Sequence, residues 1–102
     1  MPRGIIYVET MPASPDREAE YHKWYNDTHL EQILTVDGIV SARRFAPTSG
    51  DGPFIAIYEL DCDDLDGAAR QMGGLALTGL ENIAMDPKPI PYVYREIGSL
   101  GP

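Results

Sequence analysis

The chain has 102 residues, and its 16 Asp and Glu residues outnumber its 8 Lys and Arg residues, which gives a formal net charge of −8. This length predicts a single domain over residues 1–102, and the charge argues against binding to nucleic acid or to anionic membranes, which requires clustered cations. The one Cys cannot form an internal disulfide, and no apolar stretch approaches the ~18 residues of a membrane span, so we expect a soluble cytoplasmic protein.

The N-terminal part of the chain predicts a strand followed by a long helix. Residues Ile5 to Met11 mix β-branched and aromatic side chains, which is typical of a strand. Pro15 suits the first position of a helix, and nothing interrupts the helical pattern from there to about Thr35. Asp37-Gly38 then predicts the turn that ends this helix.

The rest of the chain predicts three more strands and a second helix. The strands are Ile39 to Phe45, Phe54 to Leu60 and Pro91 to Ile97, and the helix runs roughly from Leu65 to Met72, where Gly73-Gly74 ends it. The apolar stretch around Leu75 to Ala84 fits either a helical turn or a loop. The order β-α-β-β-α-β predicts an α+β protein, a ferredoxin-like sandwich with two helices on one face of a four-stranded antiparallel sheet.

The predicted strands are apolar on both faces. In the first strand, for example, Ile5 and Tyr7 alternate with Ile6 and Val8. A strand that is wet on one face should instead alternate apolar with polar residues. Because an exposed apolar sheet face of this size is costly, we predict a homodimer in which a second copy covers it, sheet against sheet.

The first helix divides into a charged arc and a polar, aromatic arc. At about 100° per residue, one arc holds four charged residues and should face solvent: Glu20, Lys23, Asp27 and Glu31. The opposite arc should face the sheet, and it holds two tyrosines, both histidines of the chain and one aliphatic residue: Tyr21, Tyr25, His22, His29 and Ile33. A helix that only packs would use aliphatic residues there, and buried imidazole and phenol groups need partners or water.

His29 is the first candidate catalytic residue on this arc. Its imidazole titrates near neutrality and can give or take a proton, although it could equally be a core histidine bonded to a carbonyl or a tyrosine. Tyr25, four residues earlier, meets His29 and could orient it, donate to a substrate oxygen, or only pack. His22 is a weaker candidate for substrate binding, and Trp24 is expected in the core or in a cavity wall.

Strand residues complete the candidate site. Arg43 and Arg44 are adjacent in a strand and therefore point to opposite faces. One of them could hold a carboxylate or enolate oxygen in the cavity, or form an interface ion pair; the spacing does not decide between them, and we take Arg44 as the substrate-binding candidate. Tyr7 and Tyr58 are strand aromatics that could line the same cavity or only pack.

Metal-binding patterns are not matched. In the acidic run Asp61 to Gly67, Leu65 occupies the fifth position, where an EF-hand needs an oxygen ligand. The two histidines are seven residues apart and lack the i,i+4 spacing of a histidine pair that binds zinc on a helix. We therefore predict no metal site and no cofactor.

The stretch from Tyr21 to Leu30, followed by Val36 to Phe45, resembles the dimeric α+β-barrel superfamily and, within it, EthD-like small proteins. These proteins carry an aromatic pair, a His four residues on, and a Gly-led strand that ends in Arg and an aromatic residue. Many of them have the sequence His-Leu-Pro in this helix, whereas Glu31 follows Leu30 in this chain. The resemblance implies a homodimeric ferredoxin-like fold with a pocket between helix and sheet. It also implies acid–base catalysis by the histidine of the helix, which is His29.

Together these features lead us to expect a cofactor-independent enzyme of the lyase or isomerase type, acting on a small aromatic or polyketide-like carbonyl compound. His29 would move a proton, and Tyr25, with Tyr58 or an arginine, would stabilise the oxyanion. Two alternatives stay open: a cofactor-free monooxygenase on the same scaffold, and a non-catalytic protein that binds a small ligand or serves in a stress response.

Overall fold

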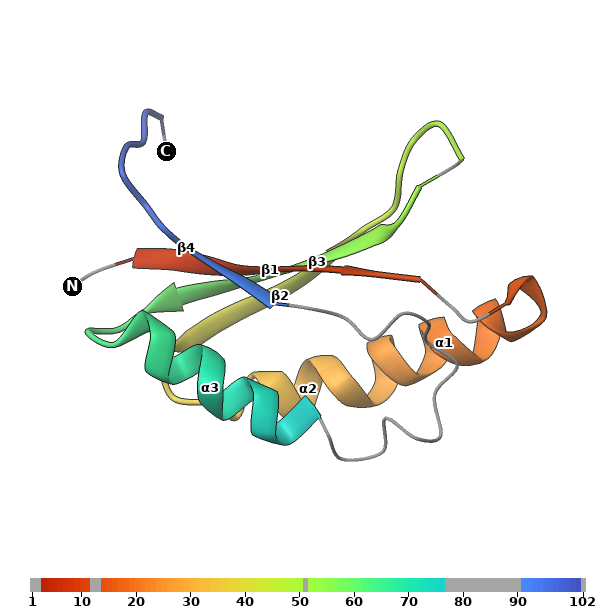
Figure 1. Cartoon of the computed structure of the whole chain (residues 1–102), viewed down its shortest axis with the longest axis horizontal. Helices are drawn as coiled ribbons and strands as arrows, with labels where there is room; N and C mark the ends of the chain where they lie inside the picture. Colours follow the sequence, from red (N-terminus) through yellow and green to blue (C-terminus); the bar gives the residue numbers. More distant parts are fainter. Residues whose placement is uncertain (1–2, 12–13, 51, 77–90, 102) are drawn as a thin grey trace.

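A computed structural model describes residues 3–11, 14–50, 52–76 and 91–101 of the chain. The strands β1 (Arg3–Thr10), β2 (Ile39–Phe45), β3 (Phe54–Asp61) and β4 (Pro91–Arg95) form one antiparallel sheet in the order β2-β3-β1-β4. The described helices all lie against one face of this sheet (Figure 1). This arrangement confirms the α+β, ferredoxin-like fold predicted from the order of elements.

The first helical region is continuous but not uniform. It consists of a 3-10 turn η1 (Pro15–Arg17), α1 (Glu18–Trp24), a π-helical turn η2 (Tyr25–His29) and α2 (Leu30–Ile33). The predicted helix is therefore present, but the wider π turn in its middle is not signalled by the hydrophobic pattern. The helix ends at Ile33, slightly before the predicted Thr35, and the chain turns toward β2 at the predicted Asp37-Gly38, where Gly38 has a φ of 97°, a backbone conformation that favours glycine.

The second helix, α3 (Leu65–Ala76), is longer than predicted. The sequence predicts its end at Gly73-Gly74, but the helix continues through both glycines to Ala76. Each glycine costs only about 1 kcal/mol relative to alanine, and Ala68 and Met72 are buried in the core and hold the helix on the sheet. The rest of the apolar stretch that fits either a helical turn or a loop, residues 77–84, lies outside the described residues. Within the described part of the chain, no helix is long and apolar enough to cross a membrane.

The register of the sheet separates the strand residues into two faces. Even-numbered residues of β1 and β3, such as Ile6 and Tyr58, are buried beneath the helices, and odd-numbered residues, such as Tyr7 and Ile57, lie on the other face, which we call the open face. β2 contains an irregularity between Ile39 and Ser41. Because an extra residue in a strand reverses the alternation beyond it, Ile39 and Arg44 both face the helices although one number is odd and the other even.

The core between sheet and helices has two parts. The larger cluster joins aliphatic residues of the sheet to α2 and α3, with Ile6, Ile33 and Leu60 at its centre. The smaller cluster lies under α1 and η2 and is aromatic, with Tyr21 and Tyr25 buried. The chemistry-bearing residues of the helix therefore lie in a region of their own beside the aliphatic core.

Candidate functional site

The inward face of α1 and η2 carries a ladder of buried side chains at intervals of four residues. Tyr21, Tyr25, His29 and Ile33 are all buried, with exposed fractions of 4% or less. The charged residues of the other arc are exposed, as predicted. The ladder continues across the π turn, so the periodicity of the sequence correctly identifies the arc that faces the sheet.

His29 lies inward and is enclosed by aromatic rings. Its imidazole stacks on Trp24 with ring centroids 4.3 Å apart and 18° between planes, and it meets the Tyr25 ring edge-on at 5.1 Å. Burial lowers the pKa of His29 below its ordinary value of about 6.5, and the nearby Gln32 side chain opposes this shift. At neutral pH the ring is therefore uncharged. Its Nδ1 is buried and has no hydrogen-bond partner among the described residues.

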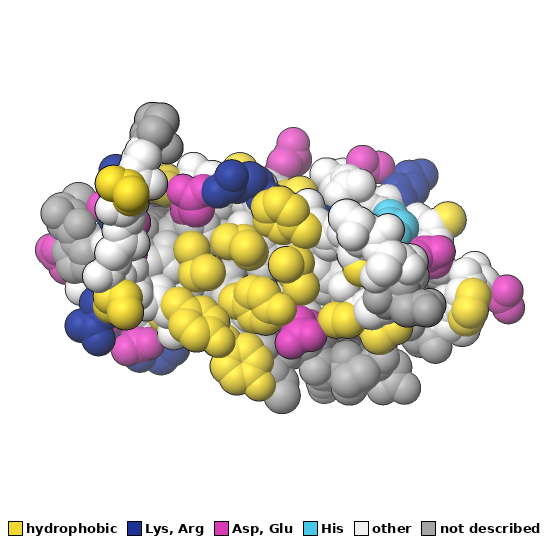
Figure 2. Space-filling view, turned by 90° about the horizontal axis from the view of Figure 1, so that it is seen from above, with side chains coloured by type: hydrophobic (Ala, Val, Ile, Leu, Met, Phe, Trp, Pro, Cys, Tyr) yellow, Lys and Arg dark blue, Asp and Glu magenta, His cyan; other side chains and the backbone are white. Residues whose placement is uncertain are grey.

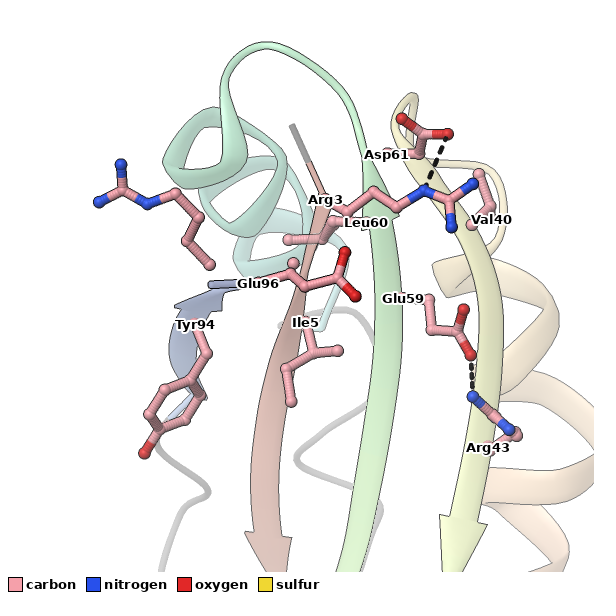
Figure 3. Close-up of a pocket in the computed structure, with 11 residues that line it drawn as sticks. Arg3, Ile5, Val40, Arg43, Glu59, Leu60, Asp61, Tyr94 and Glu96 are labelled. Carbon is pink, nitrogen blue, oxygen red and sulfur yellow. Dashed lines mark ion pairs between the residues drawn. The ribbon is translucent and has the colours of Figure 1, made fainter. Parts of the chain in front are cut away.

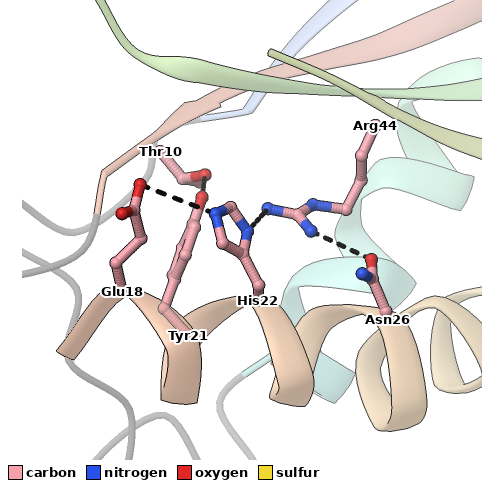
Figure 4. Close-up of polar contacts among 6 residues, drawn as sticks. All are labelled: Thr10, Glu18, Tyr21, His22, Asn26 and Arg44. Atoms are coloured by element: carbon pink, nitrogen blue, oxygen red, sulfur yellow. Dashed lines mark hydrogen bonds and ion pairs between the residues drawn. The ribbon is translucent and has the colours of Figure 1, made fainter.

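Arg44 enters the same region from β2. Its Nη1 donates to Asn26 Oδ1 at 2.9 Å, and its Nη2 donates to His22 Nδ1 at 3.1 Å (Figure 4). The guanidinium carbon lies 4.4 Å from the centre of the Tyr25 ring and 5.2 Å from that of Tyr21, distances at which a cation is attracted to an aromatic face. Within the described part of the chain, no carboxylate pairs with it.

His22 is half-buried between Arg44 and Glu18. Because its Nδ1 accepts a hydrogen bond from Arg44, the proton of the ring must be on Nε2, which lies 3.7 Å from Glu18 Oε1. The ring also meets Phe54 edge-on at 4.6 Å. His22 therefore holds the guanidinium in place as a neutral ring.

Two buried tyrosines add hydrogen-bond donors that keep their protons at neutral pH. Burial, followed by the neighbouring Tyr21, raises the pKa of Tyr25 to about 12, although Arg44 acts in the opposite direction. Burial also raises the pKa of Tyr58 well above its ordinary value, and the neighbouring Tyr25 adds to this shift. Both phenols are protonated at neutral pH, and Tyr58 Oη has no hydrogen-bond partner among the described residues.

Some residues of the site are not identified by the sequence patterns. Tyr21 shares a buried hydrogen bond with the hydroxyl of Thr10 at the end of β1, and Asn26 fixes Arg44 (Figure 4). A signal for Asn26 exists in the sequence, since it lies four residues after His22 and so shares its helix face. Thr10 has no such signal, because only the register of the sheet brings it to the helix.

The structure places Tyr7 away from this cluster, contrary to the expectation that it lines the same cavity. Tyr7 lies on the open face, where its ring meets that of Tyr94 edge-on at 6.4 Å. Because β1 is apolar on both faces, its sequence does not show on which face of the sheet Tyr7 lies. Arg43 is also on the open face and pairs with Glu59. Of the two neighbouring arginines, Arg44 is therefore the one beneath the helix.

A cavity of about 430 Å³ opens on the open face, on the side of the sheet away from His29 and Arg44 (Figure 3). Its walls include Ile5, Val40 and Tyr94. Its charged residues include two ion pairs, Arg43 with Glu59 and Arg3 with Asp61, the latter at 3.9 Å. Because these charges compensate each other, the cavity offers less to an ionic ligand than the unpaired guanidinium beneath the helix.

The cluster beneath the helix is suited to stabilising an anion that forms on an aromatic or carbonyl compound. Arg44 and Tyr25 supply donors for a negatively charged oxygen, and His29 supplies a neutral base. Arg44 and His29 both contact the ring of Tyr25, so donor and base lie one phenol ring apart. Among the described residues, no group of three or more His, Cys, Asp or Glu side chains is arranged to hold a metal ion.

No protein-family model matches the sequence, and no curated protein sequence matches it significantly. Solved structures do match the fold. The chain is similar to Rv0793 from Mycobacterium tuberculosis, with a TM-score of 0.74, 14% identity, and 97% of this chain and 99% of that one covered.

Two further solved structures match over nearly the whole chain. An EthD (ethyl tert-butyl ether D) family protein from Bacillus halodurans has a TM-score of 0.64 at 10% identity, with 95% of this chain and 100% of that one covered. A monooxygenase from the ActVA-Orf6 gene of Streptomyces coelicolor, in complex with nanaomycin D, has a TM-score of 0.64 at 17% identity, with 97% and 92% covered. The chain therefore has the fold that EthD-like proteins share with small monooxygenases.

Proposed function

We propose that the chain is a cofactor-independent monooxygenase that acts on a small aromatic or polyketide-like carbonyl compound. The observation that carries the proposal is the guanidinium of Arg44, which lies over the rings of Tyr21 and Tyr25, is held by His22 and Asn26, and has no described carboxylate partner. The similarity in fold to a monooxygenase supports oxygen chemistry over the lyase or isomerase reaction expected from the sequence.

The first step is removal of a proton from the substrate. The neutral ring of His29 takes a proton from a carbon next to the carbonyl group. The negative charge moves to the carbonyl oxygen, where Arg44 and the protonated Tyr25 stabilise it. Donors that already point toward the forming charge in a water-poor site stabilise it more than water does.

The second step is attack of the enolate carbon on O2. Transfer of electrons from the carbanion forms a C–O bond and a peroxide anion, which takes back the proton held by His29 to give a hydroperoxide. Loss of the remaining C–H proton and cleavage of the O–O bond then release water and leave a new carbonyl group. A CH2 group and one O2 thus become a C=O group and one H2O. The substrate carbon supplies the electrons that reduce the second oxygen atom, so the reaction requires no external reductant.

The reaction expected from the sequence, catalysed by a lyase or isomerase, begins with the same proton transfer. In that case the enolate would be reprotonated at another carbon or would expel a leaving group, and no oxygen would be consumed. Measurement of dissolved oxygen during turnover separates the two reactions. Unchanged recovery of a tightly bound ligand would instead support a binding protein without catalysis.

Oxygen uptake with a panel of polycyclic phenols and 1,3-diketones tests the proposal. We expect Arg44→Met and His29→Asn each to reduce kcat/KM by ~100-fold or more, the usual range for loss of an oxyanion donor or a general base. Arg70→Met is the matched control, because Arg70 is exposed on α3 and its described ion pair is with Asp64, at 3.6 Å. Full activity in both site variants would exclude this mechanism.

We also propose that two copies associate through their open faces. Apolar side chains gather at the centre of this face with charged residues around them (Figure 2). They are Ile5, Tyr7, Phe45, Ile55, Ile57, Tyr92 and Tyr94, and Phe45, Tyr92 and Tyr94 remain 44%, 50% and 53% exposed. The ion pairs Arg43 with Glu59 and Arg3 with Asp61 lie on this face, so four of its charges are paired within one copy, whereas the exposed Glu9 has no ion-pair partner among the described residues.

Sedimentation of the purified protein tests the association. We expect a dimer in the wild type and a monomer in Ile57→Asp, because that change places a charge at the centre of the apolar patch without entering the core. Leu34→Asp is the control, since Leu34 is 47% exposed near the end of the first helix, on the other side of the molecule. A wild-type protein that is monomeric at high concentration would contradict the proposal.

A further inference from the structure

Gln32, in α2, carries a buried polar atom that the mechanism above does not use. Its side-chain oxygen Oε1 is buried and has no hydrogen-bond partner among the residues that the structure describes. A buried acceptor without a partner costs free energy. Gln32 follows His29 by three residues, and side chains at this spacing are neighbours on the surface of a helix. His29 is therefore the first place to look for the partner of this amide.

Nδ1 of His29 is the second unpaired buried atom on this part of the helix. A ring nitrogen that carries a proton is a donor and an amide oxygen is an acceptor, so the two atoms are complementary. The Gln32 side chain also acts on His29 as a hydrogen-bond partner and raises the pKa of His29, against the larger and opposite effect of burial. A partner that raises the pKa stabilises the protonated ring, which is the effect of an acceptor.

The burial of Nδ1 also indicates which nitrogen of His29 can serve as a base. Nδ1 is enclosed and the ring is stacked on Trp24, which leaves Nε2 as the nitrogen for a substrate proton. A neutral imidazole has one N–H group and one lone pair. Nε2 can therefore take a proton only when the ring's own proton is on Nδ1. In that tautomer Nδ1–H needs an acceptor inside the protein.

We infer that Gln32 is a positioning residue, which accepts a hydrogen bond from Nδ1–H of His29 and so keeps the lone pair of the ring on Nε2. One hydrogen bond satisfies both unpaired atoms. The tautomer is a property of the folded chain, whereas its use in catalysis rests on the proposed function. His22 has the opposite tautomer, because its Nδ1 accepts from Arg44. The two histidines of the chain should therefore differ.

Long-range 1H–15N correlation spectra test the tautomer without any substrate, because they distinguish a protonated ring nitrogen from one with a free lone pair. At about pH 8 both rings are neutral, and the signals missing from His29→Asn assign His29. We expect the proton of His29 on Nδ1 and that of His22 on Nε2. Gln32→Met keeps the length of the side chain but removes the acceptor, so His29 should lose its preference for Nδ1–H. Gln32→Glu keeps an acceptor and should preserve it.

Two results of this experiment would overturn the inference. One is a wild-type His29 with its proton on Nε2, which would mean that the amide donates to the ring. The other is an unchanged tautomer in Gln32→Met. Gln71→Met is the matched control, because Gln71 is exposed on α3, and it should leave both histidine signals in place.

Kinetics then separate this inference from the proposed function. We expect Gln32→Met to lower kcat by ~10-fold or more with little change in KM, because fewer molecules hold the reactive tautomer. Gln32→Glu should recover most of this loss, and Gln71→Met should have no effect. A wild type that shows the expected tautomer but no turnover would contradict the proposed function and leave the hydrogen bond standing. An altered tautomer with full activity would overturn the positioning role.

Discussion

His29 is uncharged in the folded protein because its surroundings are aromatic and poor in water. Its pKa is lowered in the folded state, so the unfolded chain binds a proton more readily than the folded one does. Stability is therefore complete above the unfolded pKa of about 6.5 and declines as the pH falls below it. The side chain that serves as a base near neutrality is thus also a cause of acid sensitivity.

We expect the free energy of unfolding of the wild type to fall between pH 7 and pH 5.5, and His29→Asn to reduce this slope. This pH range lies above the ordinary pKa values of Asp and Glu side chains, so their titration contributes little to the change in the free energy of unfolding. Urea denaturation at several pH values measures the effect. An unchanged slope in the variant would show that His29 binds its proton equally well in both states.

Replacement by phenylalanine is expected to change the stability of the protein in opposite directions at Tyr58 and at Tyr21. Tyr58 Oη is buried without a described partner, whereas Tyr21 Oη shares a buried hydrogen bond with Thr10. We expect Tyr58→Phe to raise the free energy of unfolding by ~1 kcal/mol and Tyr21→Phe to lower it by a similar amount. Thermal denaturation of the two variants checks both signs, and a loss of stability in Tyr58→Phe would reveal a hydrogen bond at that hydroxyl.

At the scale of elements, the π turn η2 determines how the two halves of the first helix face the sheet. A π turn accommodates one residue more than an α-helical turn, and such turns are frequent at functional sites. Here it allows Tyr21 and Tyr25 to face the aromatic cluster while Ile33 faces the aliphatic core. The π turn therefore connects α1, which contributes to the aromatic cluster of the candidate site, to α2, which packs in the aliphatic core.

Deletion of single exposed residues tests this role. Removal of Thr28 from η2 should restore a regular helix and be tolerated, at a cost of ~1–2 kcal/mol, because the flanking segments keep their faces. Removal of Lys23 from α1 should be far more disruptive, since it turns the preceding segment by about 100° and exposes Tyr21. Urea denaturation compares the two deletions, and equal losses would show that the π turn does not absorb a residue.

At the scale of the whole molecule, net charge and the open face act against each other. Each copy carries a formal charge of −8, so two copies repel at long range, whereas the centre of the open face is apolar and two ion pairs lie on the same face. The proposed dimer therefore depends on burial of apolar area and is opposed by the overall charge.

We expect the dimer to become tighter when salt is added. Raising the ionic strength from 0.01 M to 0.15 M shortens the Debye length from ~30 Å to ~8 Å and screens the repulsion. Sedimentation equilibrium at the two salt concentrations measures the change in the dissociation constant. Weaker association at the higher concentration would mean that ion pairs between the copies, and not apolar contacts, dominate the interface.

Features that depend on local periodicity can be predicted from the sequence alone. The order of strands and helices, the turn at Asp37-Gly38 and the inward arc that carries Tyr25 and His29 all follow from residues that are close in the chain. Patterns of two and 3.6 residues reflect burial directly, so they can be recognised without knowing which surface covers each element.

Which strand residues lie beneath the helix becomes clear from the folded sheet and not from the sequence. A single irregularity in β2 turns Arg44 inward and Arg43 outward, and alternation from Ile39 alone would give the opposite result. The sequence does not assign Tyr7 to one face of the sheet, because its strand is apolar on both faces. The physical reason is that strand alternation shows two faces without saying which one meets the helices, and one extra residue exchanges them.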